Sequence, residues 1–211
     1  GMSALTSNTT ANYNTAIGRY ALYDNTTGAQ NTAVGRSAAR YNSTGSNNIA
    51  VGMNCLLANT TGGSNTAIGV DALKTVTTNW GNVAIGHSAL ALNTGEYNTA
   101  VGTTAMDTNT SGDRNVAIGY GALDANTTGS RNVANGAYAL AVNTTASENT
   151  AIGYQALSNN VTGAENTATG YQALRNNTAS YNAAFGHETL ELNTSGVGNT
   201  AVGADAMQAN T

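Results

Sequence analysis

The chain has 211 residues, only 9% of them charged, and a formal net charge of -4. It lacks the basic stripe of a nucleic-acid-binding protein, and no apolar run is long enough to span a membrane. Its single cysteine excludes an intramolecular disulfide. We therefore expect neither a nucleic-acid partner nor membrane insertion.

One unit, N-T-A-[IV]-G-x-x-A-L-x-x-N-T-T-G-x-x, occurs twelve times along the chain. Nine of the eleven spacings between opening asparagines are 17 residues, and two are 16. Such a period is typical of a solenoid, in which small coils stack on one another. We predict a single array over residues 3–211, beginning with half a unit, and Gly1-Met2 resembles an expression scar. The units open at Asn14, Asn31, Asn48, Asn65, Asn82, Asn98, Asn115, Asn132, Asn149, Asn166, Asn182 and Asn199.

The start of each unit predicts a short β-strand that ends at a glycine. Counting the opening asparagine as repeat position 1, position 3 is alanine and position 5 is glycine in all twelve units. Position 4 is Ile or Val in nine units. Because side chains alternate along a strand, positions 2 and 4 share one face and position 3 takes the other. An invariant alanine implies close approach to a backbone, either across the coil or in a neighbouring chain.

The second half of the unit predicts a less regular path. Positions 6 and 7 vary and are often polar, which favours a solvent-facing location, whereas positions 8 and 9 are mostly Ala and Leu. Positions 6–11 fit either a second short strand or a helical turn. Positions 12–15, Asn-Thr-Thr-Gly, predict a turn. In stacked coils, positions 1 and 12 become two asparagine columns, and the second is interrupted only at Val76.

These patterns predict a mainly β fold, a parallel β-roll or β-helix with one coil per 16–17 residues. The core should contain the small and apolar residues that recur at fixed positions. We assign to it Ala16, Ala33, Ala50, Ala67, Ala84, Gly18, Gly35, Gly52, Ile17, Ile68, Ile85, Leu22, Leu73 and Leu90.

The segment N-T-A-[IV]-G-x-x-A resembles the repeats of YadA-like trimeric adhesin heads. The fuller unit, as in residues 149–157, is similar to repeats of phage tail-fibre proteins. The adhesin resemblance implies a left-handed parallel β-roll that assembles as a homotrimer. It also implies that the position-3 alanines pack near a three-fold axis. The longer turn and the adjacent Ala-Leu pair depart from the adhesin pattern.

No catalytic constellation can be assembled from this sequence. His87 and His187 both occupy position 6, but they lie six coils apart, or roughly 29 Å at the spacing of stacked strands. No zinc-ligand spacing or phosphate-binding loop is present, and Cys55 replaces an alanine as a small buried residue. We therefore expect no enzymatic activity, no cofactor and no metal.

The outward positions offer candidates for receptor contact. Tyr154 and Tyr171 should stack as neighbours and form an aromatic platform, or simply cover the coil edge. Trp80 is either an exposed contact or folds over the edge. Arg114 and Arg131 precede two glutamates in the position-17 column, which is either a docking stripe or a solvated corner.

Two residues break the apolar pattern of position 4. Asn135 and Thr169 replace Ile or Val there. A buried asparagine needs hydrogen-bond partners, so at a three-fold axis we expect a polar site that sets the register or holds water, with an ion site as the alternative.

The repeat predicts a structural rod, and the resemblance implies that it is an adhesive fibre segment outside the cell, from a phage tail fibre or a bacterial surface adhesin. Its expected partners are two further copies of itself and a host glycan or protein. An ice-binding solenoid that uses the threonines of positions 2 and 13, and an inert spacer rod, are the alternatives.

Overall fold

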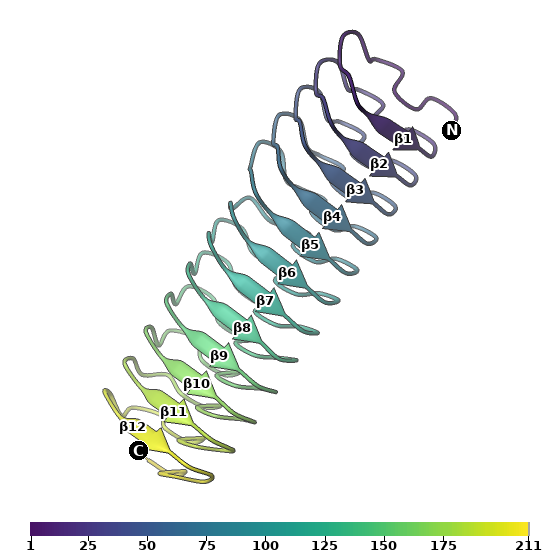
Figure 1. Ribbon diagram of the computed structural model, residues 1–211. Helices are drawn as coiled ribbons and strands as arrows, with labels where there is room; N and C mark the ends of the chain where they lie inside the picture. Colours follow the sequence, from purple (N-terminus) through teal and green to yellow (C-terminus); the bar gives the residue numbers. More distant parts are fainter. Residues whose placement is uncertain (211) are drawn as a thin grey trace.

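The computed structural model describes residues 1–210, and Thr211, the last residue of the predicted array, lies outside the described residues. The chain winds into a straight rod in which twelve strands stack side by side in sequence order (Figure 1). Every neighbouring pair of strands is parallel. The strands are β1 (Thr15–Ile17), β2 (Thr32–Val34), β3 (Ile49–Val51), β4 (Thr66–Ile68), β5 (Val83–Ile85), β6 (Thr99–Val101), β7 (Val116–Ile118), β8 (Val133–Asn135), β9 (Thr150–Ile152), β10 (Thr167–Thr169), β11 (Ala183–Phe185) and β12 (Thr200–Val202). The predicted parallel β-solenoid is therefore confirmed.

The register follows the repeat without a slip. Ala16 pairs with Ala33 and Thr167 pairs with Ala183, so the two 16-residue units stay aligned with the others. The missing residue is absorbed in the turn, where a change of length costs least. Each coil therefore places equal repeat positions above one another.

The core lies inside each coil and is only as wide as an alanine on the strand side. The position-3 alanines of β2–β11 are fully buried, and fully buried Ala and Leu side chains of positions 8 and 9 pack opposite them. A larger position-3 side chain would collide with the far wall of the coil. The invariant alanine is thus explained within one chain, and the three-fold-axis explanation is wrong.

Three residues assigned to the core point the other way. Ile17, Ile68 and Ile85 are 59%, 37% and 38% exposed. They occupy position 4, on the outer face of the sheet, because the strand turns its alternate side chains away from position 3. The leucines Leu22, Leu73 and Leu90, by contrast, are fully buried as predicted.

Positions 6–11 form neither of the two predicted elements. Residues 1–210 contain no helix, and this stretch is a series of turns. Its backbone is left-handed at positions 7 and 9, as at Tyr20 (φ 61°) and Leu22 (φ 48°). Hydrogen bonds to the adjacent coils hold this path, as from Ser37 N–H to the Arg19 carbonyl (2.8 Å) and from Leu22 N–H to the Ala38 carbonyl (3.1 Å).

The glycine of position 5 is required by both its conformation and its surroundings. Gly102 has φ +139°, and a Cβ atom there would lie 2.4 Å from the carbonyl oxygen of Gly119. The backbones of successive coils meet at this corner, so no side chain fits.

Both predicted asparagine columns are present and buried. In the position-12 column, Asn126 Nδ2 donates to Asn109 Oδ1 (2.7 Å) and to the Gly129 carbonyl (2.9 Å). In the position-1 column, Asn115 N–H donates to Asn98 Oδ1 (2.9 Å). Such an amide bonds the neighbouring coil and also closes a turn of its own coil, although Asn160 closes its turn without reaching Asn143. Such amide ladders stiffen stacked strands.

Candidate functional site

One regular surface of the rod is the outer face of the sheet, built from positions 2 and 4. Position 4 forms a row of exposed or half-exposed side chains along the whole stack, and ten of the twelve are apolar. Position 2 adds a parallel row in which seven of twelve residues are threonine. The position-4 row comprises Ile17, Val34, Val51, Ile68, Ile85, Val101, Ile118, Asn135, Ile152, Thr169, Phe185 and Val202. We call this surface the sheet face.

Asn135 and Thr169 lie within the sheet face. Asn135 is exposed and sits in register between Ile118 and Ile152, while Thr169 is half-buried. In a single chain, Asn135 is therefore not the buried polar group that the sequence suggested, because the strand turns it outward. An axial role for these two residues stays a prediction that depends on association through this face.

A second surface carries a column of aromatic rings. Tyr154 and Tyr171 stack at 5.5 Å between ring centroids with planes 16° apart, which confirms that they are stacked neighbours. Tyr171 in turn stacks on His187 at 5.0 Å, and Tyr120 and Tyr138 extend the column edge to face. Because Tyr154, Tyr171 and His187 cover one another's faces, this part of the column presents ring edges outward. The expected flat aromatic platform is therefore not formed here.

Trp80 combines features of both interpretations made from the sequence. Its ring covers Gly63 of the preceding coil, since a Cβ on Gly63 would lie 2.5 Å from the ring. The side chain nevertheless stays 43% exposed. It packs over the coil edge and still offers an apolar surface to a partner.

The position-17 column pairs two of its four charges. Arg131 forms an ion pair with Glu148 at 2.7 Å, and both side chains are largely exposed. The Arg114 guanidinium lies over the Tyr97 ring, 5.7 Å from its centroid. An exposed pair of this kind contributes little stability, which suits a solvated corner.

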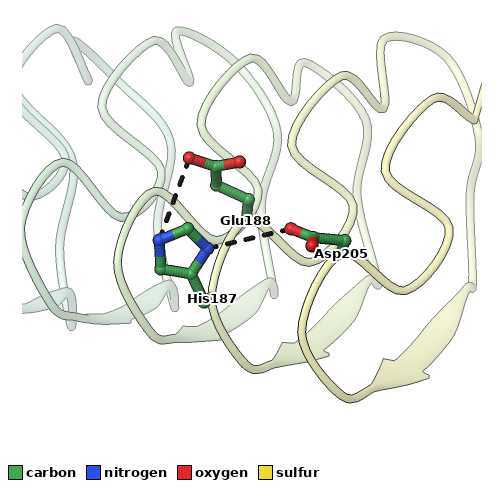
Figure 2. A group of neighbouring side chains, drawn as sticks. All are labelled: His187, Glu188 and Asp205. Carbon is green, nitrogen blue, oxygen red and sulfur yellow. Dashed lines mark ion pairs between the residues drawn. The ribbon is translucent and has the colours of Figure 1, made fainter.

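His187, Glu188 and Asp205 form the one cluster among residues 1–210 whose groups could hold a metal ion (Figure 2), and it was not predicted from the sequence. Glu188 Oε1 lies 3.9 Å from His187 Nε2, and Asp205 Oδ1 lies 3.7 Å from Nδ1. The two carboxylates thus face opposite ring nitrogens. A metal ion bonds one imidazole nitrogen at about 2.0–2.1 Å, so an ion held by His187 and one carboxylate would leave the other carboxylate facing the opposite ring nitrogen. The repeat period gave the signal, because Asp205 follows Glu188 by 17 residues.

Cys55 is buried, and its thiol donates to the Gly52 carbonyl (3.1 Å). Burial raises the pKa of this thiol to about 12, so it is protonated at neutral pH and is a poor nucleophile. It therefore packs as the small core residue that the sequence predicted.

Comparison of the chain with protein-family models, with curated proteins and with solved structures gives no match. Residues 1–210 contain no helical segment that could cross a bilayer.

Proposed function

We propose that this chain is a structural and adhesive segment of an extracellular fibre, in which the sheet faces of three copies pack together. The observation that carries this proposal is the outward-facing row of position 4, which runs from β1 to β12 and is apolar in ten of the twelve strands, with Asn135 and Thr169 as the exceptions. The twelve coils extend for roughly 55 Å and the strands are about 10 Å long, so the face covers about 550 Å². Even though threonines share this face, a regular surface with an apolar row of this length is of the size that marks interaction sites on monomers.

A second copy of the same chain is the partner that best matches this face. The rows recur at every coil in an unbroken register, so two copies can match along their whole length. A partner without the same period would match only a few coils. In an assembly with closed symmetry, the sheet face of every copy is buried against another copy. The proposed number of copies, three, comes from the resemblance to trimeric adhesin heads.

The adhesive part of the proposal rests on the outward rows. A trimeric rod presents three copies of each exposed group, such as Trp80 or the edges of Tyr154 and Tyr171, so weak receptor contacts add through avidity. The resemblance places such a rod in a phage tail fibre or a bacterial surface adhesin. Binding to a glycan array that is lost in the Trp80→Ala variant would support adhesion, whereas no binding at all would leave a spacer rod.

The molar mass in solution, measured by light scattering on a sizing column, tests the association. We expect a mass about three times the 21.2 kDa of one chain. The double variant Ile85→Lys/Ile118→Lys places charges in the centre of the sheet face and should run as a single chain, because buried unpaired charges are costly. A wild-type monomer would exclude the trimer.

The matched control is Leu92→Lys/Val142→Lys. These two apolar side chains are 48% and 39% exposed, as exposed as the two isoleucines, but they lie at position 11, outside the sheet face. The control variant should keep the trimeric mass. Loss of the trimer in both double variants would show that charge alone disrupts association, and it would remove the support for this face.

Ice binding is the second candidate, because the position-2 threonines lie on a flat, exposed sheet. The position-13 threonines are poor candidates, since their hydroxyls donate to carbonyls of the next coil, as from Thr26 to Ser43 (3.0 Å) and from Thr127 to Thr144 (2.9 Å). Ice binding would be favoured over the fibre if the wild-type chain is a monomer that shows thermal hysteresis and the Ile85→Lys/Ile118→Lys variant shows none.

A further inference from the structure

Three arginines surround a small hollow near the first coils. The hollow has a volume of about 220 Å³ and is lined by Arg19, Tyr20, Arg36, Ser37 and Arg40. Arg19 and Arg36 occupy position 6 of successive coils, so the backbone stacks them in one column. Arg40 reaches the same hollow from position 10 of the second coil. The period therefore gathers three positive charges on one side of the rod.

Aromatic rings hold two of these guanidinium groups in place. Those of Arg19 and Arg40 lie 4.7 Å and 4.8 Å from the centroid of the Tyr20 ring, and Arg19 Nη2 also donates to the Tyr20 hydroxyl (3.0 Å). Arg40 lies over Tyr41 as well, at 5.0 Å. Cation–π contacts of this kind orient a guanidinium without neutralising its charge.

The positive charges have no acidic partner. Within residues 1–210, no carboxylate forms an ion pair with Arg19, Arg36 or Arg40, whereas Arg131 and Arg175 each pair with a glutamate. The Nε atom of Arg40 is buried and has no hydrogen-bond partner among residues 1–210. The hydrogen bond and the charge of Arg19 lower the pKa of the Tyr20 phenol, which reflects the positive potential of the hollow. Like charges held together without an acid repel one another, and a bound anion would relieve that repulsion.

We propose that this hollow binds a tetrahedral oxyanion, as a free sulfate or phosphate ion or as the sulfate or phosphate ester of a sugar. Guanidinium groups present several N–H donors in a fixed plane and match such oxygens well. The hollow is smaller than the roughly 300–1,000 Å³ of a site for a drug-sized ligand, so it accommodates the charged group and leaves the rest of a sugar outside. This site does not depend on the association of the sheet faces.

Proton–nitrogen NMR of the arginine Nε–H groups tests the proposal directly. Sodium sulfate is titrated against sodium chloride at constant ionic strength, so that general screening cancels. We expect saturable shifts of the Arg40 Nε–H resonance with sulfate and with phosphate. The Arg36→Gln variant should weaken the affinity about tenfold, the usual effect of losing one hydrogen bond from a charged group.

The control variant is Arg114→Gln, which removes an arginine that also lies over a tyrosine but lines no part of the hollow. It should bind sulfate within about twofold of the wild type, and circular dichroism should show all variants folded. Wild-type protein without saturable shifts, or equal weakening in both variants, would overturn the proposal.

Galactose 6-sulfate, with galactose as its uncharged control, separates the two sources of the oxyanion. Binding of the sugar sulfate at least as tight as that of free sulfate would identify an ester as the ligand. Binding of the free ions alone would identify the hollow as an inorganic-anion site.

Discussion

The side chains that point into the rod and those that point out of it follow different rules. Inward, positions 3, 9 and 12 repeat almost without change, because the coil leaves room for one alanine and one leucine and needs an asparagine in each turn. Outward, position 6 changes from Arg19 and Arg36 near one end to Tyr154, Tyr171 and His187 near the other. The inner rows therefore determine the shape, while the outer rows are free to vary and can carry recognition.

A substitution of the position-5 glycine gives the strongest test that the inward-facing positions determine the shape. Gly102→Ala should lower stability by about 3 kcal/mol or more, because its Cβ would overlap the backbone of Gly119 and the residue would be strained at φ +139°. Thermal unfolding followed by circular dichroism measures the effect.

Gly198→Ala is the matched control. Gly198 also has a positive φ, +73°, but a Cβ atom there meets nothing within 4 Å. The expected cost is only the left-handed conformation, about 1 kcal/mol. Equal losses in the two variants would mean that conformation, rather than the contact between coils, makes the glycine necessary.

The position-12 column contains its own natural exception. Val76 interrupts the ladder, and Asn59 Oδ1, which would accept from that position, is buried without a hydrogen-bond partner, as is Asn143 Oδ1 where Asn160 bonds only its own turn. Asn126→Val should recreate this defect in an intact stretch and cost about 2 kcal/mol, because it leaves Asn109 Oδ1 without its donor.

The reciprocal variant Val76→Asn should raise the melting temperature, since its amide can donate to Asn59 Oδ1. A lower melting temperature in Val76→Asn would show that apolar packing at this coil outweighs the ladder. Hydrogen exchange of the neighbouring backbone amides would locate either effect within the stack.

The repeat period predicted the stacking, the strands and both asparagine columns, because these follow from identical residues at equal spacing. It did not predict which side of the strand is inside. Alternation separates position 3 from positions 2 and 4, but hydrophobicity favours burying Ile85 rather than Ala84, and the structure does the opposite. Alanine faces inward because the coil is narrow. The width of the coil depends on the turns of positions 6–11 opposite the strand, which the strand residues alone do not reveal.

The backbone path of positions 6–11 could not be predicted from the sequence, and the reason is energetic. Leucine is unfavourable in the left-handed region, yet Leu22 and Leu73 both adopt it, at φ 48°. Hydrogen bonds between coils compensate for this local cost, and no local pattern reports them. The arginine hollow and the His187 cluster were predictable in part, since a 17-residue spacing stacks Arg19 with Arg36 and Glu188 with Asp205.

The smallest expected effect concerns an acidic column at position 10. Burial raises the pKa of the Asp107 carboxyl, while burial and the charge of Asp107 raise that of Asp124. The folded chain thus holds these protons more tightly than the unfolded chain. The stabilisation is complete below the unfolded pKa, near 3.9, and is lost as the pH rises through the folded pKa.

Asp124→Asn should therefore raise stability at pH 7, by less than about 1 kcal/mol because solvent screens these partly exposed groups. The gain should shrink as the pH falls toward 4, where the wild-type carboxyls are protonated. Melting temperatures measured from pH 4 to 8 test this, with Asp24→Asn as a control that changes the net charge equally. A gain independent of pH, or one shared by the control, would mean that reduced net charge rather than the stacked carboxylates stabilises the rod. The outer rows would then influence stability only through their total charge.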